Sequence, residues 1–189
     1  MKILLIDNNT EHKSALSSAL GGHDVEVQVY RPGLDFHVHD KDLVILSGGG
    51  GEGQEISDTH TEDKLWYADE MQFVLNCQKP VIGICMGFEV MAKAYGQNVP
   101  SLGKLVYGVN TVESTERGWQ IFGKSKFKQV EAHSWHVKQA PKGFDELLRS
   151  ENGVEAIYSQ KLKRFATQFH PELGGTLDFD VLIKTTLSA

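Results

Sequence analysis

A cysteine between two glycines is the residue best placed to do chemistry in this chain. Cys85 lies in the segment Gly83-Ile-Cys-Met-Gly87, after a short apolar run and before a stretch with helical spacing. Gly-x-Cys-x-Gly is the nucleophile-elbow pattern with sulfur in place of oxygen, and so tight a turn needs small residues on both sides. The start of the following helix would favour a thiolate. The alternative is a structural cysteine at the end of a core strand.

A histidine and a glutamate far along the chain add two further candidate groups. His170 and Glu172 follow a strand predicted over 165–169, and Pro171 ends that strand because proline cannot donate to a ladder. A nucleophile, a base and an acid that orients the base form a covalent catalytic site. The pair alone would also fit a surface turn, but together with Cys85 it predicts a triad.

Four consecutive glycines, at 48–51, follow a buried strand predicted over 43–46. Backbone N–H groups in such a loop can turn inward around a phosphate or around the oxyanion of an acyl-transfer intermediate. No Gly-Lys-Ser/Thr follows, so a phosphate loop is a poor fit. An oxyanion loop beside Cys85 fits better, and a flexible surface loop is the alternative.

The elements that would position these groups alternate between strand and helix in the first half of the chain. Strands are predicted over 3–6, 25–30, 43–46 and 81–84, and helices over 12–20, over 63–76 and after residue 87. The second half is β-rich, with strands predicted over 105–112, 120–122, 128–132, 154–158 and 164–169. This order predicts an α/β fold with an open, mostly parallel sheet flanked by helices. The candidate groups then fall at the carboxyl edge of the sheet, where sites of such folds lie.

These motifs resemble those of the class I, triad-type, glutamine amidotransferases, from the segment 3–8 to the segment 168–172. The resemblance implies a single domain over 1–189 with a flavodoxin-like fold. It assigns Cys85 as the nucleophile that attacks the side-chain amide of L-glutamine, His170 as the base and Glu172 as its orienting acid. Ammonia would leave, and water would hydrolyse the thioester.

The resemblance also implies residues that bind the oxyanion and the substrate. The oxyanion donors would be the backbone N–H groups of Gly49 and Met86. The substrate would meet Gly51 and the backbone groups of Ser134 and Trp135. The stretch that follows, over 137–144, is most similar to glutaminase domains of GMP synthetase.

Two positions depart from the family pattern. Gly50 stands where the family usually has a proline, which gives the loop more backbone freedom. Glu89 stands where the family usually has a glutamine that contacts the substrate, and the related γ-glutamyl hydrolases resemble the chain more closely there. We expect Glu89 to touch the substrate or to support the elbow.

Composition limits the class of protein. With 189 residues, 40% hydrophobic and 23% charged, the chain suits one soluble globular domain. The net charge of −6 argues against a nucleic-acid surface, and no run is long enough for a membrane span or a signal peptide. Cys77 and Cys85 are expected to be free thiols in the cytoplasm.

No cofactor or metal site is expected from the sequence. His37 and His39 have a metal-like spacing without a further ligand. His133 and His136 could replace His170 as base, but neither has a carboxylate two residues later. We expect all four histidines to be structural or exposed. The acidic segment 52–63, which contains His60, is expected to be solvated surface.

The function expected from the sequence is a glutaminase that supplies ammonia to an ATP-dependent synthetase or ligase on another chain, with GMP synthetase as the best match. The chain carries no ATP-binding motif, which is why a partner is expected. One alternative is a γ-glutamyl hydrolase or peptidase that acts without a partner. Another is a non-catalytic regulatory module with the same fold.

Overall fold

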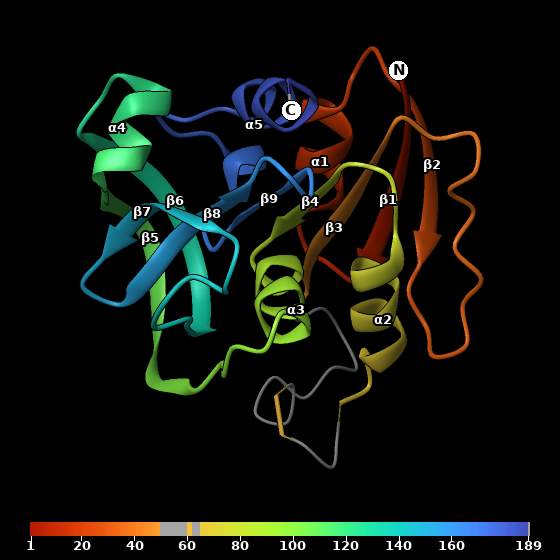
Figure 1. The fold of residues 1–189 in the computed structure, drawn as a ribbon, viewed down its shortest axis with the longest axis horizontal. Helices are drawn as coiled ribbons and strands as arrows, with labels where there is room; N and C mark the ends of the chain where they lie inside the picture. The colour runs from red at the N-terminus through yellow and green to blue at the C-terminus, as the bar shows by residue number, and fades with distance from the viewer. Residues whose placement is uncertain (50–59, 62–64, 189) are drawn as a thin grey trace.

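The computed structural model describes residues 1–49, 60–61 and 65–188, and these form one mixed sheet with helices on both faces (Figure 1). The strand order is β2-β1-β3-β4-β9-β8-β7-β5-β6. Strands β2, β1, β3, β4 and β9 are parallel, and the pairs from β9 to β6 are antiparallel. The predicted α/β sheet with a β-rich second half is therefore confirmed.

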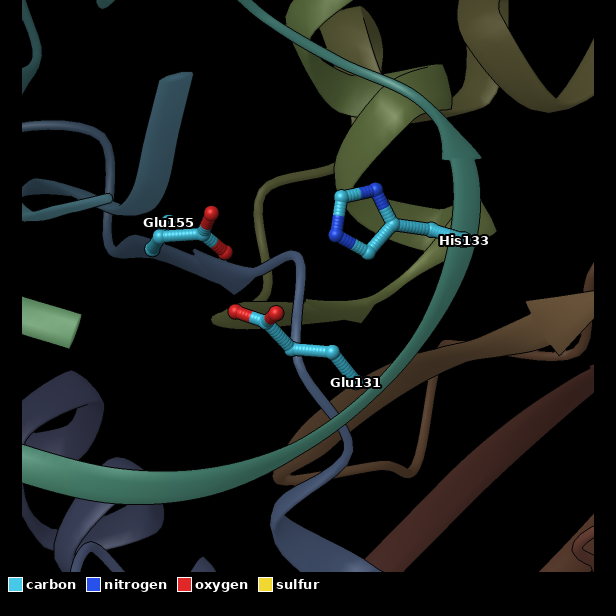
Figure 2. A group of neighbouring side chains, drawn as sticks. All are labelled: Glu131, His133 and Glu155. Carbon is cyan, nitrogen blue, oxygen red and sulfur yellow. The ribbon is translucent and has the colours of Figure 1, made fainter. Parts of the chain in front are cut away.

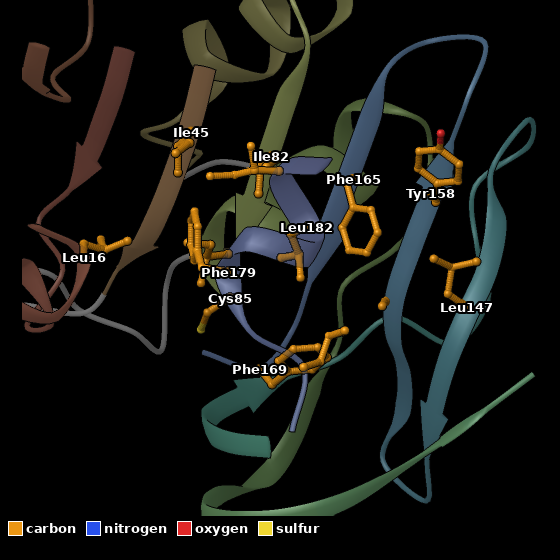
Figure 3. Close-up of a cluster of buried hydrophobic side chains, with 14 of the residues drawn as sticks. Leu16, Ile45, Ile82, Cys85, Leu147, Tyr158, Phe165, Phe169, Phe179 and Leu182 are labelled. Atoms are coloured by element: carbon orange, nitrogen blue, oxygen red, sulfur yellow. The ribbon is translucent and has the colours of Figure 1, made fainter. Parts of the chain in front are cut away.

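The parallel half is built around buried strands. Its strands are β1 (Lys2–Asn8), β2 (Asp24–Val29), β3 (Leu43–Gly49), β4 (Val81–Ile84) and β9 (Arg164–Thr167), and its helices are α1 (Lys13–Ala19), α2 (Ala68–Asn76), α3 (Met86–Ala94) and α5 (Phe179–Leu187). Successive strand residues face opposite sides of a sheet, so strands that are apolar throughout need cover on both faces. One apolar cluster joins the sheet to α1 and α5, which contribute Leu16 and Leu182 to it (Figure 3). The other cluster joins it to α2 and α3.

The antiparallel half curls back toward the parallel half. It consists of β8 (Gly153–Ser159), β7 (Asp145–Ser150), β5 (Ser101–Ser114), β6 (Lys126–Trp135) and the helix α4 (Glu116–Phe122). Strand β6 comes last in the strand order, yet the backbone N–H of His170 donates to the carbonyl oxygen of Val130 on β6 at 2.8 Å. The curl therefore brings β6 to the carboxyl ends of β4 and β9.

Three predicted elements need correction. Residues 120–122 are the last turn of α4 and not a strand. The hydroxyl of Thr115 accepts a hydrogen bond from the N–H of Gly118 and starts this helix. Gly118 packs so closely on Leu147 of β7 that a Cβ atom would lie 2.0 Å from its carbonyl oxygen. Strand β7 and helix α5 were not predicted.

The other two corrections concern element boundaries. Helix α2 starts at Ala68, so the predicted residues 65–67 precede it, and residues 63 and 64 lie outside the described part of the chain. Tyr67 is fully buried there, and its hydroxyl bonds to His60 at 2.5 Å. Strand β9 ends at Thr167, so His170 follows it by three residues and not directly. Among the described helices, none combines the length and the apolar character that a membrane crossing requires.

Candidate active site

Cys85 occupies a strained turn between β4 and α3. Its backbone has φ 48° and ψ −103°, which is uncommon for a residue with a side chain. A Cβ on Gly83 would lie 2.5 Å from the carbonyl oxygen of Gly87, and one on Gly87 would lie 2.5 Å from that of Leu46. Real Cβ atoms do not approach so closely. The geometry therefore has the form of the predicted elbow and requires both glycines.

Neighbouring strands place the other candidate groups beside the elbow. The Cys85 N–H donates to the carbonyl oxygen of Thr167 on β9 at 2.7 Å. His170 is buried, and its Nδ1 donates to Oε1 of Glu172 at 2.7 Å. A Cβ on Gly48 would lie 3.0 Å from Cε1 of His170 and 3.6 Å from Cβ of Cys85. The three predicted triad residues therefore lie together at the carboxyl ends of β3, β4 and β9.

The charges of Cys85 and His170 depend on each other. Burial alone would lower the pKa of His170, but the Cys85 thiolate, which the imidazole is close enough to hydrogen-bond, and the Glu172 carboxylate raise it to about 10. Burial raises the pKa of the Cys85 thiol, and the adjacent imidazolium counteracts this. A thiolate at this position therefore requires a protonated His170 beside it.

The predicted oxyanion and substrate residues lie partly within the described chain. Met86 is the first residue of α3, where N–H groups lack partners within the helix. Gly49 ends β3 opposite Asn8 of β1. Ser134 and Trp135 are half-buried and end β6, just after Ala132, whose carbonyl oxygen lies 3.7 Å from the Cys85 sulfur. Gly50 and Gly51 lie outside the described residues.

Glu89 is buried and its carboxylate contacts two other side chains. Oε1 accepts from Nε2 of Gln168 at 2.9 Å, and Oε2 lies 2.9 Å from Nε2 of His60. The imidazole of His60 also meets the edge of Trp135, with ring centroids 4.8 Å apart. Glu89 therefore links α3 with the segment that carries His60. The expectation of a solvated segment is wrong for His60, because this residue is only 7% exposed.

The structure adds two residues that sequence reasoning did not assign to the site. The ring of His12 lies 4.8 Å from that of His170 in an edge contact, and burial followed by the charge of His170 lowers the pKa of His12. Gln168 fixes one oxygen of Glu89. A signal was available for both, because His12 follows the first predicted strand and Gln168 belongs to the last. Each is therefore close to the carboxyl edge of the sheet.

The fold and this cluster define an α/β protein with a cysteine elbow and a histidine–carboxylate pair at the carboxyl edge of a parallel sheet. The family model described as glutamine amidotransferase class-I matches residues 4–187. The chain belongs to that family.

Curated relatives match different shares of their own length. The chain is 32% identical over 181 residues to the glutamine-hydrolyzing GMP synthase of Campylobacter lari, a match that covers 90% of this chain and 33% of that protein. It is 34% identical over 130 residues to one subunit of the glutamine-hydrolyzing GMP synthase of Sulfolobus acidocaldarius, covering 68% of this chain and 66% of that one. The chain thus spans about a third of the first relative and about two thirds of the second.

Solved structures share the fold. A candidate GMP synthase subunit from Thermoplasma acidophilum superposes with a TM-score of 0.81 at 22% identity, covering 100% of this chain and 92% of that one. A glutamine amidotransferase from Thermotoga maritima gives a TM-score of 0.69 at 18% identity, covering 91% and 76%.

Proposed function

We propose that this chain hydrolyses the side-chain amide of L-glutamine and supplies the ammonia to an ATP-dependent synthetase. The observation that carries this proposal is the placement of Cys85 on an elbow beside the hydrogen-bonded pair of His170 and Glu172. Membership of the class-I glutamine amidotransferase family supports the choice of reaction.

The mechanism follows from the charges of these groups. The Cys85 thiolate attacks the amide carbon, and the backbone N–H groups of Met86 and Gly49 stabilise the oxyanion. The C–N bond breaks as the His170 imidazolium gives its proton to the departing nitrogen, which leaves as ammonia. The now neutral imidazole takes a proton from water, and the resulting attack on the thioester releases glutamate and restores the thiolate. Glu172 holds the imidazole in the required tautomer.

The acceptor of the ammonia belongs to the same proposal. The relatives named GMP synthase support a GMP-forming synthetase as the partner. We assign residues 1–189 to a single amidotransferase domain that works in the cytoplasm. Ser134 and Trp135 contact the amino-acid end of glutamine, and Gly51 is a further substrate-binding residue.

A second substrate class rests on Glu89. A carboxylate accepts hydrogen bonds but does not donate them, so it suits an ammonium or amide N–H group of the substrate and cannot donate to a carbonyl as a glutamine would. Free glutamine offers both donors as well, so γ-glutamyl compounds are the alternative because the chain resembles γ-glutamyl hydrolases at Glu89.

The test is the release of ammonia from L-glutamine, compared with hydrolysis of a panel of γ-glutamyl compounds. We expect Cys85→Ala to reduce turnover by about 10³-fold or more. Cys77→Ala is the matched control, because Cys77 is also buried but lies at the end of α2. A glutamine analogue with an electrophile at the amide carbon should label Cys85. Labelling of Cys77 instead, or full activity of Cys85→Ala, would end the proposal.

A further inference from the structure

Three buried side chains converge inside the antiparallel half: Glu131, His133 and Glu155 (Figure 2). Glu131 and His133 are two residues apart on β6, so both point to the same side of that strand. Glu155 reaches them from β8 because the sheet is curled. One ligand atom from each residue lies within 4.8 Å of the others, and the residues are 0%, 4% and 1% exposed.

The atoms that face one another in this cluster lack hydrogen-bond partners among the described residues. They are both carboxylate oxygens of Glu131, Oε2 of Glu155 and Nε2 of His133. A buried polar atom without a partner is costly, and buried carboxylates are normally paired or bound to a metal ion. The cluster therefore has the polar atoms of a binding site.

The hydrogen bond and the orientation of His133 determine which of its ring nitrogens could bind an ion. Its Nδ1 donates to the carbonyl oxygen of Trp135 at 2.7 Å, so the proton of the neutral ring is on Nδ1 and Nε2 carries a lone pair. The ring is turned toward the two carboxylates (Figure 2). The lone pair of Nε2 and the two carboxyl groups then face each other, and a cation between them would bind all three.

The outer contacts of the cluster are of the kind that orient metal ligands. The carbonyl of Trp135 fixes the tautomer of His133, and the hydroxyl of Ser150 donates to Oε1 of Glu155 at 2.5 Å, which leaves Oε2 free to bind. A pocket of about 700 Å³, lined by Asn110, Glu131 and Ser150 among others, adjoins the cluster at Glu131.

We propose that Glu131, His133 and Glu155 bind a divalent transition-metal ion, for which zinc is the best match. An imidazole nitrogen and two carboxylate oxygens suit Zn²⁺, with bonds of about 2.0–2.2 Å. Ligand atoms of a tetrahedral site at those bond lengths lie roughly 3.3 Å apart, so small side-chain rotations close the site. Three protein ligands leave the fourth position to water.

The metal would also fix the strand that touches the catalytic candidates. Residues 130 and 132 alternate with the ligands on β6, and their carbonyl oxygens contact the His170 N–H and the Cys85 sulfur. An ion bound to Glu131 and His133 therefore holds the backbone against the elbow. The metal site itself does not depend on the proposed reaction.

The experiment measures metal binding directly. Chelator-treated Cys85→Ala protein is titrated with Zn²⁺ by calorimetry and with Co²⁺ by visible absorption, because the thiol of Cys85 beside His170 could itself bind these ions. We expect one ion per chain. In the same background, Glu131→Gln, His133→Gln and Glu155→Gln should each weaken binding by more than about 100-fold, beyond the effect of losing an outer contact.

The matched control is His136→Gln, because Nδ1 of His136 is also buried without a hydrogen-bond partner among the described residues but lies outside the cluster. Its affinity should be unchanged, and Zn²⁺ should raise Tm in the control and not in Glu131→Gln. If the ligand variants do not fold, Ser150→Ala should still weaken binding about 10–100-fold. No binding at micromolar Zn²⁺, equal affinity in every variant, or loss with His136→Gln would overturn the proposal.

Discussion

The parallel and antiparallel halves of the sheet bury different kinds of side chain. In β3 and β4 the buried side chains are apolar except that of Ser47 near the end of β3, and most polar groups of the site follow the strands. In β6 and β8 polar residues are buried within the strands themselves, namely Gln129, Glu131, His133 and Glu155, beside apolar residues of the core. The parallel half forms the elbow through close backbone packing. The antiparallel half contacts the elbow through polar groups of β6. His170 and Glu172 lie where the two halves meet, because β9 pairs with both β4 and β8.

The largest expected effect is at this junction. His170→Ala should reduce the turnover of glutamine by about 10³-fold or more, because both the partner of the thiolate and the proton donor are lost. Glu172→Gln should cost less, since the imidazole remains and only its orientation suffers. Steady-state kinetics measure both variants. His136→Ala is the control, and an equal loss there in folded protein would reassign the base.

The stability of the parallel half should depend on pH, because Glu70 of α2 is a fully buried acid. Burial raises its pKa to about 8 from 4.5, although a hydrogen bond from Asn8 opposes the shift. The unfolded chain thus loses its proton near pH 4.5 and the folded chain near pH 8, so stability falls as pH rises between these values and is level above. The loss should be roughly 5 kcal/mol, which is the difference between the two pKa values multiplied by about 1.4 kcal/mol.

Urea unfolding at pH 5 and pH 8 measures this slope, which Glu70→Gln should reduce but not remove, because burial and the Glu131 carboxylate also raise the pKa of Glu155 to about 8. Asp69→Asn, one residue earlier and exposed, should keep it. A slope that is unchanged in Glu70→Gln would contradict the prediction and assign the pH dependence to the buried acids Glu131 and Glu155.

Substituting one glycine in each half tests whether the parallel half controls activity as well as stability and the antiparallel half controls stability alone. Gly87→Ala and Gly118→Ala each place a Cβ atom against a backbone carbonyl, at 2.5 Å and 2.0 Å. Each should destabilise the fold by about 2–3 kcal/mol. Folded Gly87→Ala protein should also be inactive, while folded Gly118→Ala protein should keep its kcat. Gly21→Ala, where the nearest atom is 3.1 Å away, is the milder control. Full activity of Gly87→Ala would separate the elbow from the reaction.

The smallest effect is expected for Glu89, which both halves contact through His60, Gln168 and Trp135. Glu89→Gln should change the ratio of kcat/KM for glutamine and γ-glutamyl compounds by about tenfold, which corresponds to roughly 1.4 kcal/mol. Thermal unfolding should show little change, because an amide can keep one of the two contacts. An unchanged ratio would mean that Glu89 acts only on the elbow.

The elbow could be predicted from the sequence because its requirements are local. Gly83 and Gly87 are needed within two residues of Cys85, and His170 and Glu172 are close enough in sequence to pair wherever they lie. Strands that are apolar on both faces likewise indicate a covered, parallel sheet. The sequence by itself therefore determined the parallel half and the three candidate catalytic residues.

Only the tertiary structure decided the features that depend on curvature and distant packing. Residues 120–122 are helical because α4 packs on β7. His60 is buried because it bonds to Glu89 and packs against the ring of Trp135. Glu131 and Glu155 meet because the sheet curls, and no spacing along the chain encodes that meeting. Local patterns record backbone preferences, whereas contacts between separate strands depend on how the whole sheet bends.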